Sequence, residues 1–505
     1  MLEVIRRVLD DLHQADVRYC HWKSNVRIAD SLSGHTDMDI LVDPGQRSRF
    51  LEVLYRYDFK QVRSPLWQSY PGIEDYIGFD GETGQLTHFH VHYELVLGEP
   101  MLKGYRLPWE RAFLEARVFN QANNIYIASS EWELLLLLVR WALKLTRRVG
   151  AGTLRGQGEW AGYFEEYDWL KARVDRAQVI ALSQQFLGEE AGSLMSVLLQ
   201  NDPTGARLWQ FRCAIQPYLR RYRRMEGIEK WRQVLVRRGM RRLARSRLGR
   251  WGLIASKKTL PSGGRIIALV GIDGSGKSTL AQELVRWLSW KLDAQYVYLG
   301  HGAGWSSWVT ECIKRLLRMG GKRSSSLRPK SPAESPSQTP HAPQKLSQRW
   351  KQWIKGGLYG LLALSIARDR WRKIHWARHL RNRGSIVITD RWIQNKPHRM
   401  DCPMLPALME RYPFLRIWGQ WVARYEQQLY DQMAQWGPDL VIRLRISPQT
   451  ALQRKDDLSL PMAQFKAEVL DTLEFADEPS LVEVDAEQPL ETVLLEVKRA
   501  LWQHL

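Results

Sequence analysis

The chain has 505 residues, a formal net charge of +20 and an isoelectric point near 9.8. This length exceeds what one ordinary core organises, so we expect two domains joined by connecting segments. The four cysteines are scattered without paired spacing, which excludes a disulfide framework and a cysteine-based zinc site and fits a reducing compartment. The positive charge favours an anionic partner, such as a nucleotide, a nucleic acid or an acidic membrane surface.

The sequence also indicates where the protein works. Its first residues soon become charged and show no signal-peptide pattern, and the longest apolar runs are too short and too interrupted to span a bilayer. These features predict a soluble, cytoplasmic protein, with peripheral association at the inner face of the membrane as the alternative. No pattern in the chain indicates its oligomeric state.

A predicted strand in the N-terminal part of the chain carries two acidic side chains. Residues 2–14 have the apolar spacing of an amphipathic helix, and residues 35–42 are predicted to form a strand. Asp37 and Asp39 are two positions apart on this strand, so both carboxylates face the same side. Because two like charges held close together favour a divalent cation, Asp37 and Asp39 are candidate metal ligands.

Residues 1–120 resemble the nucleotidyltransferase fold superfamily. The pair Lys23-Ser24 stands where that family usually has Gly-Ser, and Asp37-Met38-Asp39 matches its metal-binding pair. The resemblance implies a third carboxylate on a neighbouring strand. The strand-like residues 87–95 offer alternating histidines and Glu94 as the only acid. Three interpretations remain: transferase chemistry, a softer metal held by the histidines, or histidines that are satisfied partners in a half-buried strand.

The next part of the chain is predicted to be helical and then basic. We assign residues 121–205 to a helical subdomain, whose apolar helix over 129–144 begins with a capping box of Ser130 and Glu133. We assign 206–262 to a basic helical linker. From Arg220 to Lys258 there are twelve Arg and three Lys against two Glu. The linker is either a helix that lies on an anionic membrane or a solvated interdomain helix, and nucleic acid is a less favoured partner.

A glycine-rich loop lies near the middle of the chain. Five apolar residues, 266–270, run directly into GIDGSGKS, and helix-forming residues follow. In this order of strand, loop and helix, the loop N–H groups surround a phosphate, the lysine reaches the outer phosphates, and the serine hydroxyl ligates Mg²⁺. The motif therefore predicts ATP and Mg²⁺ as cofactors. The candidate nucleotide ligands are Gly271, Asp273, Gly274, Ser275, Gly276, Lys277, Ser278 and Thr279.

The strands after this loop supply further candidates. Residues 323–348 are rich in Ser and Pro and are predicted to be a disordered insertion. A strand over 385–389 then ends in Asp390-Arg391. Because the carboxyl end of a parallel strand lies beside the phosphate loop, Asp390 is a candidate metal ligand and Arg391 a candidate phosphate clamp. Later strands are predicted over 438–446 and 480–486.

Residues 263–505 resemble the thymidylate kinases in the order of their motifs, from GIDGSGKST to VDAEQPLETV. The resemblance implies that Asp273 contacts the nucleotide sugar and that Arg391 binds the acceptor phosphate. It also places Arg370 near the acceptor base, Arg454 at the start of a mobile lid, and Asp485 beside the adenine. The chain departs from the family in two places. The segment after Lys455 lacks the arginines of the lid, and residues 392–397 lack the usual thymidine-pocket side chains.

We therefore predict an α/β chain. A C-terminal P-loop kinase domain has a parallel sheet flanked by helices, and an N-terminal α+β nucleotidyltransferase-like domain carries a helical extension. The predicted activity is that of an ATP-dependent kinase of thymidylate-kinase type, with Lys277, Asp390, Arg391 and Arg454 as catalytic residues and a phosphorylated small molecule such as dTMP as acceptor. The alternatives are a sugar, glycan or lipid-linked phosphate as acceptor, or a nucleotide-regulated scaffold with a degenerate transferase domain.

Overall fold

The computed structural model divides into two compact units, Met1–Lys258 and Thr259–Leu505. The residues that it describes are 1–145, 158, 160–246, 249, 252, 254–300, 307–319, 346–396, 399–411, 415–455 and 458–505. Most of the predicted disordered insertion, 323–345, lies outside the described residues, and 346–348 begin a helix. No helix among the described ranges is both long enough and apolar enough to cross a membrane.

The first unit is built on a mixed seven-stranded sheet with the strand order β3-β4-β5-β2-β1-β9-β8. Its strands are β1 (Tyr19–His21), β2 (Met38–Val42), β3 (Lys60–Val62), β4 (Ile73–Phe79), β5 (Leu86–His92), β8 (Val118–Asn120) and β9 (Ile125–Ile127). The pairs β2·β5 and β1·β9 are parallel, and the other neighbouring pairs are antiparallel. A separate two-stranded sheet pairs β6 (Leu95–Leu97) with β7 (Tyr105–Leu107). The first unit thus combines helices with a mixed sheet, which is an α+β arrangement.

Apolar and polar side chains alternate along β2 and β5, so one face of this sheet is apolar and the other is polar. Met38 and Ile40 pack with Phe89 and Val91 in one core, which also takes the apolar face of α1 (Glu3–Gln14). The predicted amphipathic helix over 2–14 is therefore confirmed. The residues between them along the strands, including Asp39 and His90, face the other side, because side chains alternate along a strand. Short helices α2 (Ile28–Leu32), α3 (Arg47–Arg56) and α4 (Glu110–Glu115) complete this part.

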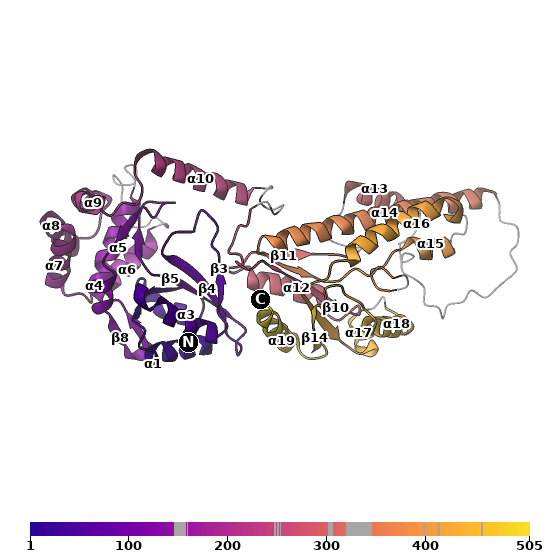
Figure 1. Cartoon of the computed structure of the whole chain (residues 1–505), viewed down its shortest axis with the longest axis horizontal. Helices are drawn as coiled ribbons and strands as arrows, with labels where there is room; N and C mark the ends of the chain where they lie inside the picture. The colour runs from indigo at the N-terminus through magenta and orange to yellow at the C-terminus, as the bar shows by residue number, and fades with distance from the viewer. Residues whose placement is uncertain are drawn as a thin grey trace. The chain divides into compact units, whose positions relative to one another are not determined.

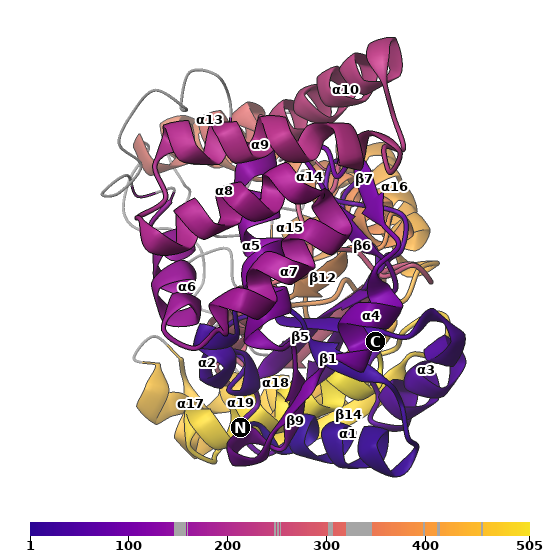
Figure 2. The ribbon, with the colours of Figure 1, turned by 90° about the vertical axis from the view of Figure 1, so that its left-hand side faces the viewer.

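A second core belongs to a helical extension. It consists of α5 (Ser130–Lys144), α6 (Ala161–Lys171), α7 (Arg176–Leu187), α8 (Glu189–Gln200) and α9 (Gly205–Arg220). Figure 2 shows α7, α8 and α9 stacked one above another against α5. Helix α9 lies within the segment that composition assigns to a linker. Its apolar side chains, such as Phe211 and Ile215, are nevertheless fully buried, so packing places α9 in the helical core.

Two sequence predictions about these helices are corrected by the structure. The N-cap of α5 is Ser129, whose hydroxyl accepts a hydrogen bond from the backbone N–H of Trp132 at 3.4 Å, and not Ser130. Glu133 does not complete a capping box. Its carboxylate instead accepts hydrogen bonds from the backbone and side chain of Asn25, and burial raises its pKa to about 7.

The second unit contains a parallel five-stranded sheet with the order β11-β12-β10-β13-β14. Its strands are β10 (Arg265–Gly271), β11 (Ala294–Val297), β12 (Ile386–Thr389), β13 (Leu440–Arg445) and β14 (Ser480–Asp485). Its helices are α12 (Lys277–Leu288), α13 (Trp308–Met319), α14 (Leu346–Asn382), α15 (Leu405–Arg411), α16 (Leu415–Ala434), α17 (Pro448–Arg454), α18 (Leu460–Asp471) and α19 (Leu490–Gln503). In Figure 1, α14 and α16 cover one side of this sheet, and α12 and α19 lie together on the other. The predicted parallel sheet flanked by helices is confirmed.

The central position of β10 follows from its composition. All residues from Ile266 to Val270 are buried, as expected for a parallel strand that is covered on both faces. Strands β12 and β13 flank β10 and run parallel to it. The loops that follow β10 and β12 therefore meet at the carboxyl edge of the sheet, where ligands bind in folds of this kind.

Candidate functional site

The loop from Gly271 to Ser278 joins the central strand to α12. Gly274 and Gly276 have φ values of +90° and +83°, which glycine adopts without the strain that a side chain would add. A Cβ at Gly274 would also lie 3.1 Å from the backbone oxygen of Ala451, so the missing side chain lets α17 approach the loop. The N-terminus of α12 follows directly after the loop. Its helix dipole and free backbone N–H groups favour an anion there.

Lys277 lies against this loop in a buried position. Its ammonium donates hydrogen bonds to the backbone oxygen of Ile272 at 2.7 Å and to the hydroxyl of Ser275 at 3.2 Å. Burial, followed by the nearby charge of Arg391, lowers the pKa of Lys277 to about 8. An ammonium has three N–H donors, so with these two bonds among the described residues one donor remains for an anion.

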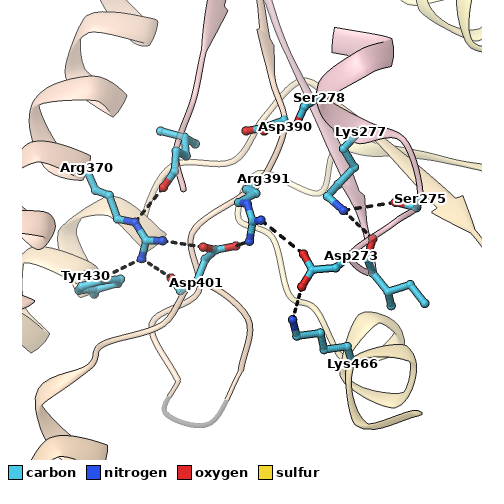
Figure 3. A network of polar contacts seen from close by, with 12 residues as sticks. Asp273, Ser275, Lys277, Ser278, Arg370, Asp390, Arg391, Asp401, Tyr430 and Lys466 are labelled. Atoms are coloured by element: carbon cyan, nitrogen blue, oxygen red, sulfur yellow. Dashed lines mark hydrogen bonds and ion pairs between the residues drawn. The ribbon is translucent and has the colours of Figure 1, made fainter. Parts of the chain in front are cut away.

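Asp390 links the loop to the neighbouring strand. Figure 3 shows its carboxylate beside the start of α12, where Oδ2 accepts a hydrogen bond from the hydroxyl of Ser278 at 3.0 Å. Oδ2 also accepts one from the hydroxyl of Tyr296 at 3.0 Å. The other oxygen, Oδ1, is buried and has no hydrogen-bond partner within the described parts of the chain. A serine hydroxyl beside a carboxylate with an unsatisfied oxygen is a set of hard ligands that fits Mg²⁺.

Arg391 is held between two carboxylates. Its guanidinium lies 3.5 Å from Asp273 of the loop and 3.5 Å from Asp401. The charge of Asp401, opposed by burial, raises the pKa of Arg391 above its usual range. The Nε of Arg391 is buried without a hydrogen-bond partner among the residues that the structure describes. The group is thus permanently charged, correctly placed beside the loop and not fully satisfied, as a phosphate clamp requires.

Arg370 contacts the same carboxylate, Asp401, that lies beside Arg391. It is almost completely buried and donates hydrogen bonds to the backbone oxygen of Leu299, to Tyr430 and to Asp401. Its contact with Asp401 measures 2.5 Å. Figure 3 shows Asp401 lying between Arg370 and Arg391. Arg370, which the thymidylate-kinase resemblance places near the acceptor base, therefore positions Asp401, and Asp401 positions Arg391.

A lysine of the predicted lid reaches the loop. Lys466 of α18 forms an ion pair with Asp273. Burial alone would raise the pKa of Asp273, but Lys466 and Arg391 outweigh it and hold this pKa well below its usual range. The segment lacks lid arginines, as the sequence shows, and Lys466 is the residue that brings positive charge to the loop from this side. No motif in the sequence marks Lys466 for this contact.

Arg454 and Asp485 lie further along the same edge of the sheet. Arg454 ends α17 and donates a hydrogen bond to the backbone oxygen of Ala486 at 3.0 Å. Asp485 ends the outer strand β14, where its carboxylate accepts hydrogen bonds from the backbone of Glu487 and the side chain of Gln488. The roles of Arg454 in a lid and of Asp485 at the adenine remain predictions.

The carboxylates predicted in the first unit have separate partners. Asp37 lies 2.9 Å from Nδ1 of His88, whereas Asp39 forms an ion pair with Lys23 at 2.8 Å. That the two share a cation remains a prediction. Glu94 lies beyond the end of β5 and pairs with Arg106 and Arg224, so it does not supply the expected third acid.

The buried carboxylate beside these histidines is Asp75 of β4. It lies opposite His90 in the antiparallel pair of β4 and β5. No sequence motif marks this acid, because its position depends on a strand pairing that no local pattern specifies.

The chain is 31% identical over 243 residues to the uncharacterized ATP-binding protein YghS of Escherichia coli strain K12, a match that covers 47% of the chain and 92% of YghS. The chain belongs to the YghS family. It is also 29% identical over 235 residues to the uncharacterized ATP-binding protein YghR of Escherichia coli strains K12 and O6:H1 (CFT073), covering 46% of the chain and 86% of each relative. No family model matches the chain.

Among solved structures, deoxyadenosine kinase from M. mycoides with bound dATP is similar over 47% of the chain and 98% of that protein at 15% identity, with a TM-score of 0.24. A likeness at that score supports no structural argument. The P-loop kinase-like fold of this YghS-family chain instead follows from its own geometry: the central strand, the glycine loop, the helix behind it and Asp390 on the adjacent strand.

Proposed function

We propose that the second unit is an ATP-dependent phosphotransferase of thymidylate-kinase type, which transfers the γ-phosphoryl group to a nucleoside monophosphate such as dTMP. The observation that carries this proposal is the contact between Ser278 and Asp390 at 3.0 Å, which joins the phosphate loop to the Asp390-Arg391 pair that follows β12. The ATP-binding description of YghS and YghR agrees with it. The order of motifs along 263–505 favours the thymidylate-kinase type.

The proposed reaction depends mainly on position and charge. The loop N–H groups and Lys277 bind the β- and γ-phosphates, and Ser278 and Asp390 hold Mg²⁺. When bound, Mg²⁺ neutralises charge on the phosphate oxygens. Arg391 binds the acceptor phosphate in exchange for its contacts with Asp273 and Asp401 and directs the acceptor oxygen toward the γ-phosphorus. As the new O–P bond forms, the bond from the γ-phosphorus to the bridging oxygen breaks and ADP leaves.

A screen for ADP release tests the proposal. Purified full-length protein is incubated with ATP and Mg²⁺ together with single acceptors from two classes, nucleoside monophosphates and phosphorylated sugars. We expect ADP release above the acceptor-free rate with at least one nucleoside monophosphate. Turnover only with a phosphorylated sugar would replace the acceptor class, and ATP binding without turnover on any acceptor would support the nucleotide-regulated scaffold instead.

A lipid-linked or membrane-bound acceptor is the second candidate, and helix α10 (Gly227–Arg245) is the observation that favours it. Ile228, Trp231 and Leu235 are 88%, 68% and 62% exposed and share one helical face by their spacing of three and seven residues. Arginines such as Arg232 and Arg242 lie among them. An exposed apolar stripe with surrounding arginines matches a helix that lies in the interface of an anionic membrane.

The other side of α10 contacts the first unit. Lys230 pairs with Glu99 at 2.6 Å, Arg237 donates a hydrogen bond to the backbone oxygen of Ser69, and Arg241 contacts the sulfur of Met101. These contacts fix the orientation of the helix on its own unit and explain why its apolar stripe faces outward. Nucleic acid would use the arginines but would leave Trp231 and Leu235 unexplained.

Vesicle cosedimentation measures this membrane association. We expect the protein to bind vesicles that contain phosphatidylserine, to bind pure phosphatidylcholine weakly, and to dissociate from the anionic vesicles as salt rises, because exposed charges are screened. The double variant Trp231→Ala/Leu235→Ala should lose most of the bound fraction. Trp421→Ala, which removes a similarly exposed tryptophan from α16, is the control and should bind like the wild type. Equal binding of both variants would refute the role of α10.

A further inference from the structure

A cluster of histidines and carboxylates lies on the polar face of the first sheet, separate from the phosphate loop. Asp39 of β2, His90 of β5 and Asp75 of β4 are in register across three neighbouring strands. His92 follows two positions after His90 and therefore faces the same side. One ligand atom each of Asp39, His90 and His92 lies within 4.8 Å of the others. For comparison, two ligand atoms of one tetrahedral zinc ion are about 3.3 Å apart.

Asp75 orients His90 for such a role. Oδ1 of Asp75 lies 2.7 Å from Nδ1 of His90. The carboxylate of Asp75 accepts a hydrogen bond from Nδ1–H of His90, so the lone pair of the ring lies on Nε2. Histidines that bind metals in proteins are commonly held by a carboxylate in this way.

His92 is the least satisfied member of the cluster. Its side chain is 1% exposed, and neither ring nitrogen has a well-formed hydrogen bond among the described residues, although the backbone of Glu94 approaches the ring. A buried imidazole without a partner is costly in a low dielectric, and such groups need an explanation such as an ion.

His88 is engaged differently and belongs outside the ligand set. Its Nε2 lies 2.9 Å from Asp75 and its Nδ1 lies 2.9 Å from Asp37. Both ring nitrogens therefore face a carboxylate, and neither is directed at the atoms of Asp39 and His92. Its contacts instead connect Asp37 and Asp75 on either side of β5.

Two lysines oppose metal binding and set its strength. The ammonium of Lys23 lies 2.8 Å from Oδ1 of Asp39, so a metal ion must use the other oxygen or displace this cation. Lys103 is a second cation in the neighbourhood of His92.

We propose that Asp39, His90 and His92 bind one divalent transition-metal ion, with Zn²⁺ as the expected class, and that Asp75 is a positioning residue for His90. The mixed nitrogen and oxygen ligand set favours such a metal over Mg²⁺, which requires oxygen ligands. The site lies in the unit Met1–Lys258 and is independent of the proposed kinase activity.

The test uses full-length protein that has been stripped with a chelator and contains no nucleotide. Zn²⁺ content is measured by mass spectrometry after gel filtration, and Co²⁺ is added as a probe with visible absorption. We expect one bound Zn²⁺ per chain and a Co²⁺ spectrum of low-symmetry nitrogen and oxygen coordination. Asp39→Ala and His92→Gln should remove the bound ion, and Asp75→Asn should weaken binding by about 10- to 100-fold. His35→Ala, an exposed histidine of the same unit, is the control and should bind like the wild type.

Lys23→Ala is expected to change the Zn²⁺ affinity in the opposite direction. Removing the ammonium beside Asp39 should tighten Zn²⁺ binding, whereas any variant that merely damages the fold would weaken it. Thermal unfolding checks folding separately: Zn²⁺ should raise the melting temperature of the wild type and of Lys23→Ala but not that of His92→Gln. Zn²⁺ retained by both Asp39→Ala and His92→Gln, binding of Mg²⁺ alone, or no bound ion in the wild type would each overturn the proposal.

Discussion

Replacing Lys277 with alanine is expected to reduce ATP-dependent phosphoryl transfer by about a hundredfold or more, since it removes a preorganised cation from a buried site where charge develops. The wild-type ammonium already lies against the loop through Ile272 and Ser275, so little reorganisation is needed to reach a phosphate. Steady-state ADP release measures the loss of turnover, and calorimetry with ATP separates it from the loss of binding.

The control for this change is Arg286→Ala. Arg286 is a cation on the same helix, but it is exposed and pairs with Glu283 at 2.5 Å, away from the loop. It should leave both ATP affinity and turnover within twofold of the wild type. Full turnover by Lys277→Ala with every productive acceptor would contradict the assignment of the loop as the site of transfer.

The pKa of Lys277, lowered by burial to about 8, also predicts a pH dependence. Below this value the side chain is charged and binds phosphate. As pH rises through about 8 the proton leaves, so the affinity for ATP should fall between pH 7 and pH 9. Lys277→Arg stays charged across this range. Its affinity should be lower overall because of the changed geometry, but almost independent of pH.

Asp390→Asn is expected to lower turnover by about a hundredfold at moderate Mg²⁺, a loss comparable with removal of one preorganised charge stabiliser. The amide keeps an oxygen for the hydrogen bonds from Ser278 and Tyr296, so the local structure should be preserved. What it loses is the negative charge that holds the metal. The expected signature is therefore a shift of the Mg²⁺ requirement to higher concentration, measured by titrating Mg²⁺ at fixed ATP.

Asp431→Asn is the matched control for this second prediction. Asp431 is an exposed carboxylate on α16 that accepts hydrogen bonds from Asn395 and Gln427. Its change should leave the Mg²⁺ titration unmoved. If the Mg²⁺ titration of Asp390→Asn were also unchanged, Asp390 would not be a metal ligand. Ser278 would then have to share the metal ion with a different residue.

Local patterns were sufficient for the elements that build the phosphate site. An unbroken apolar run, a glycine loop and a helix start specify a buried parallel strand and an anion-binding turn without help from the rest of the chain. The predicted position of Asp390 and Arg391, after another strand and beside the phosphate loop, is also confirmed. Parallel strands end at one edge of a sheet, and the structure brings Asp390 to Ser278 and Arg391 to Asp273.

The sequence by itself thus determined the phosphate loop, the parallel sheet and the residues at its carboxyl edge, because each depends on spacing within a short segment. Only the tertiary structure decided three contacts: Asp401 with Arg391, Lys466 with Asp273, and Asp75 with His90. Those contacts join residues from 10 to 193 positions apart. Their formation depends on how strands pair and helices pack, and the spacing of residues along the chain carries no information about it.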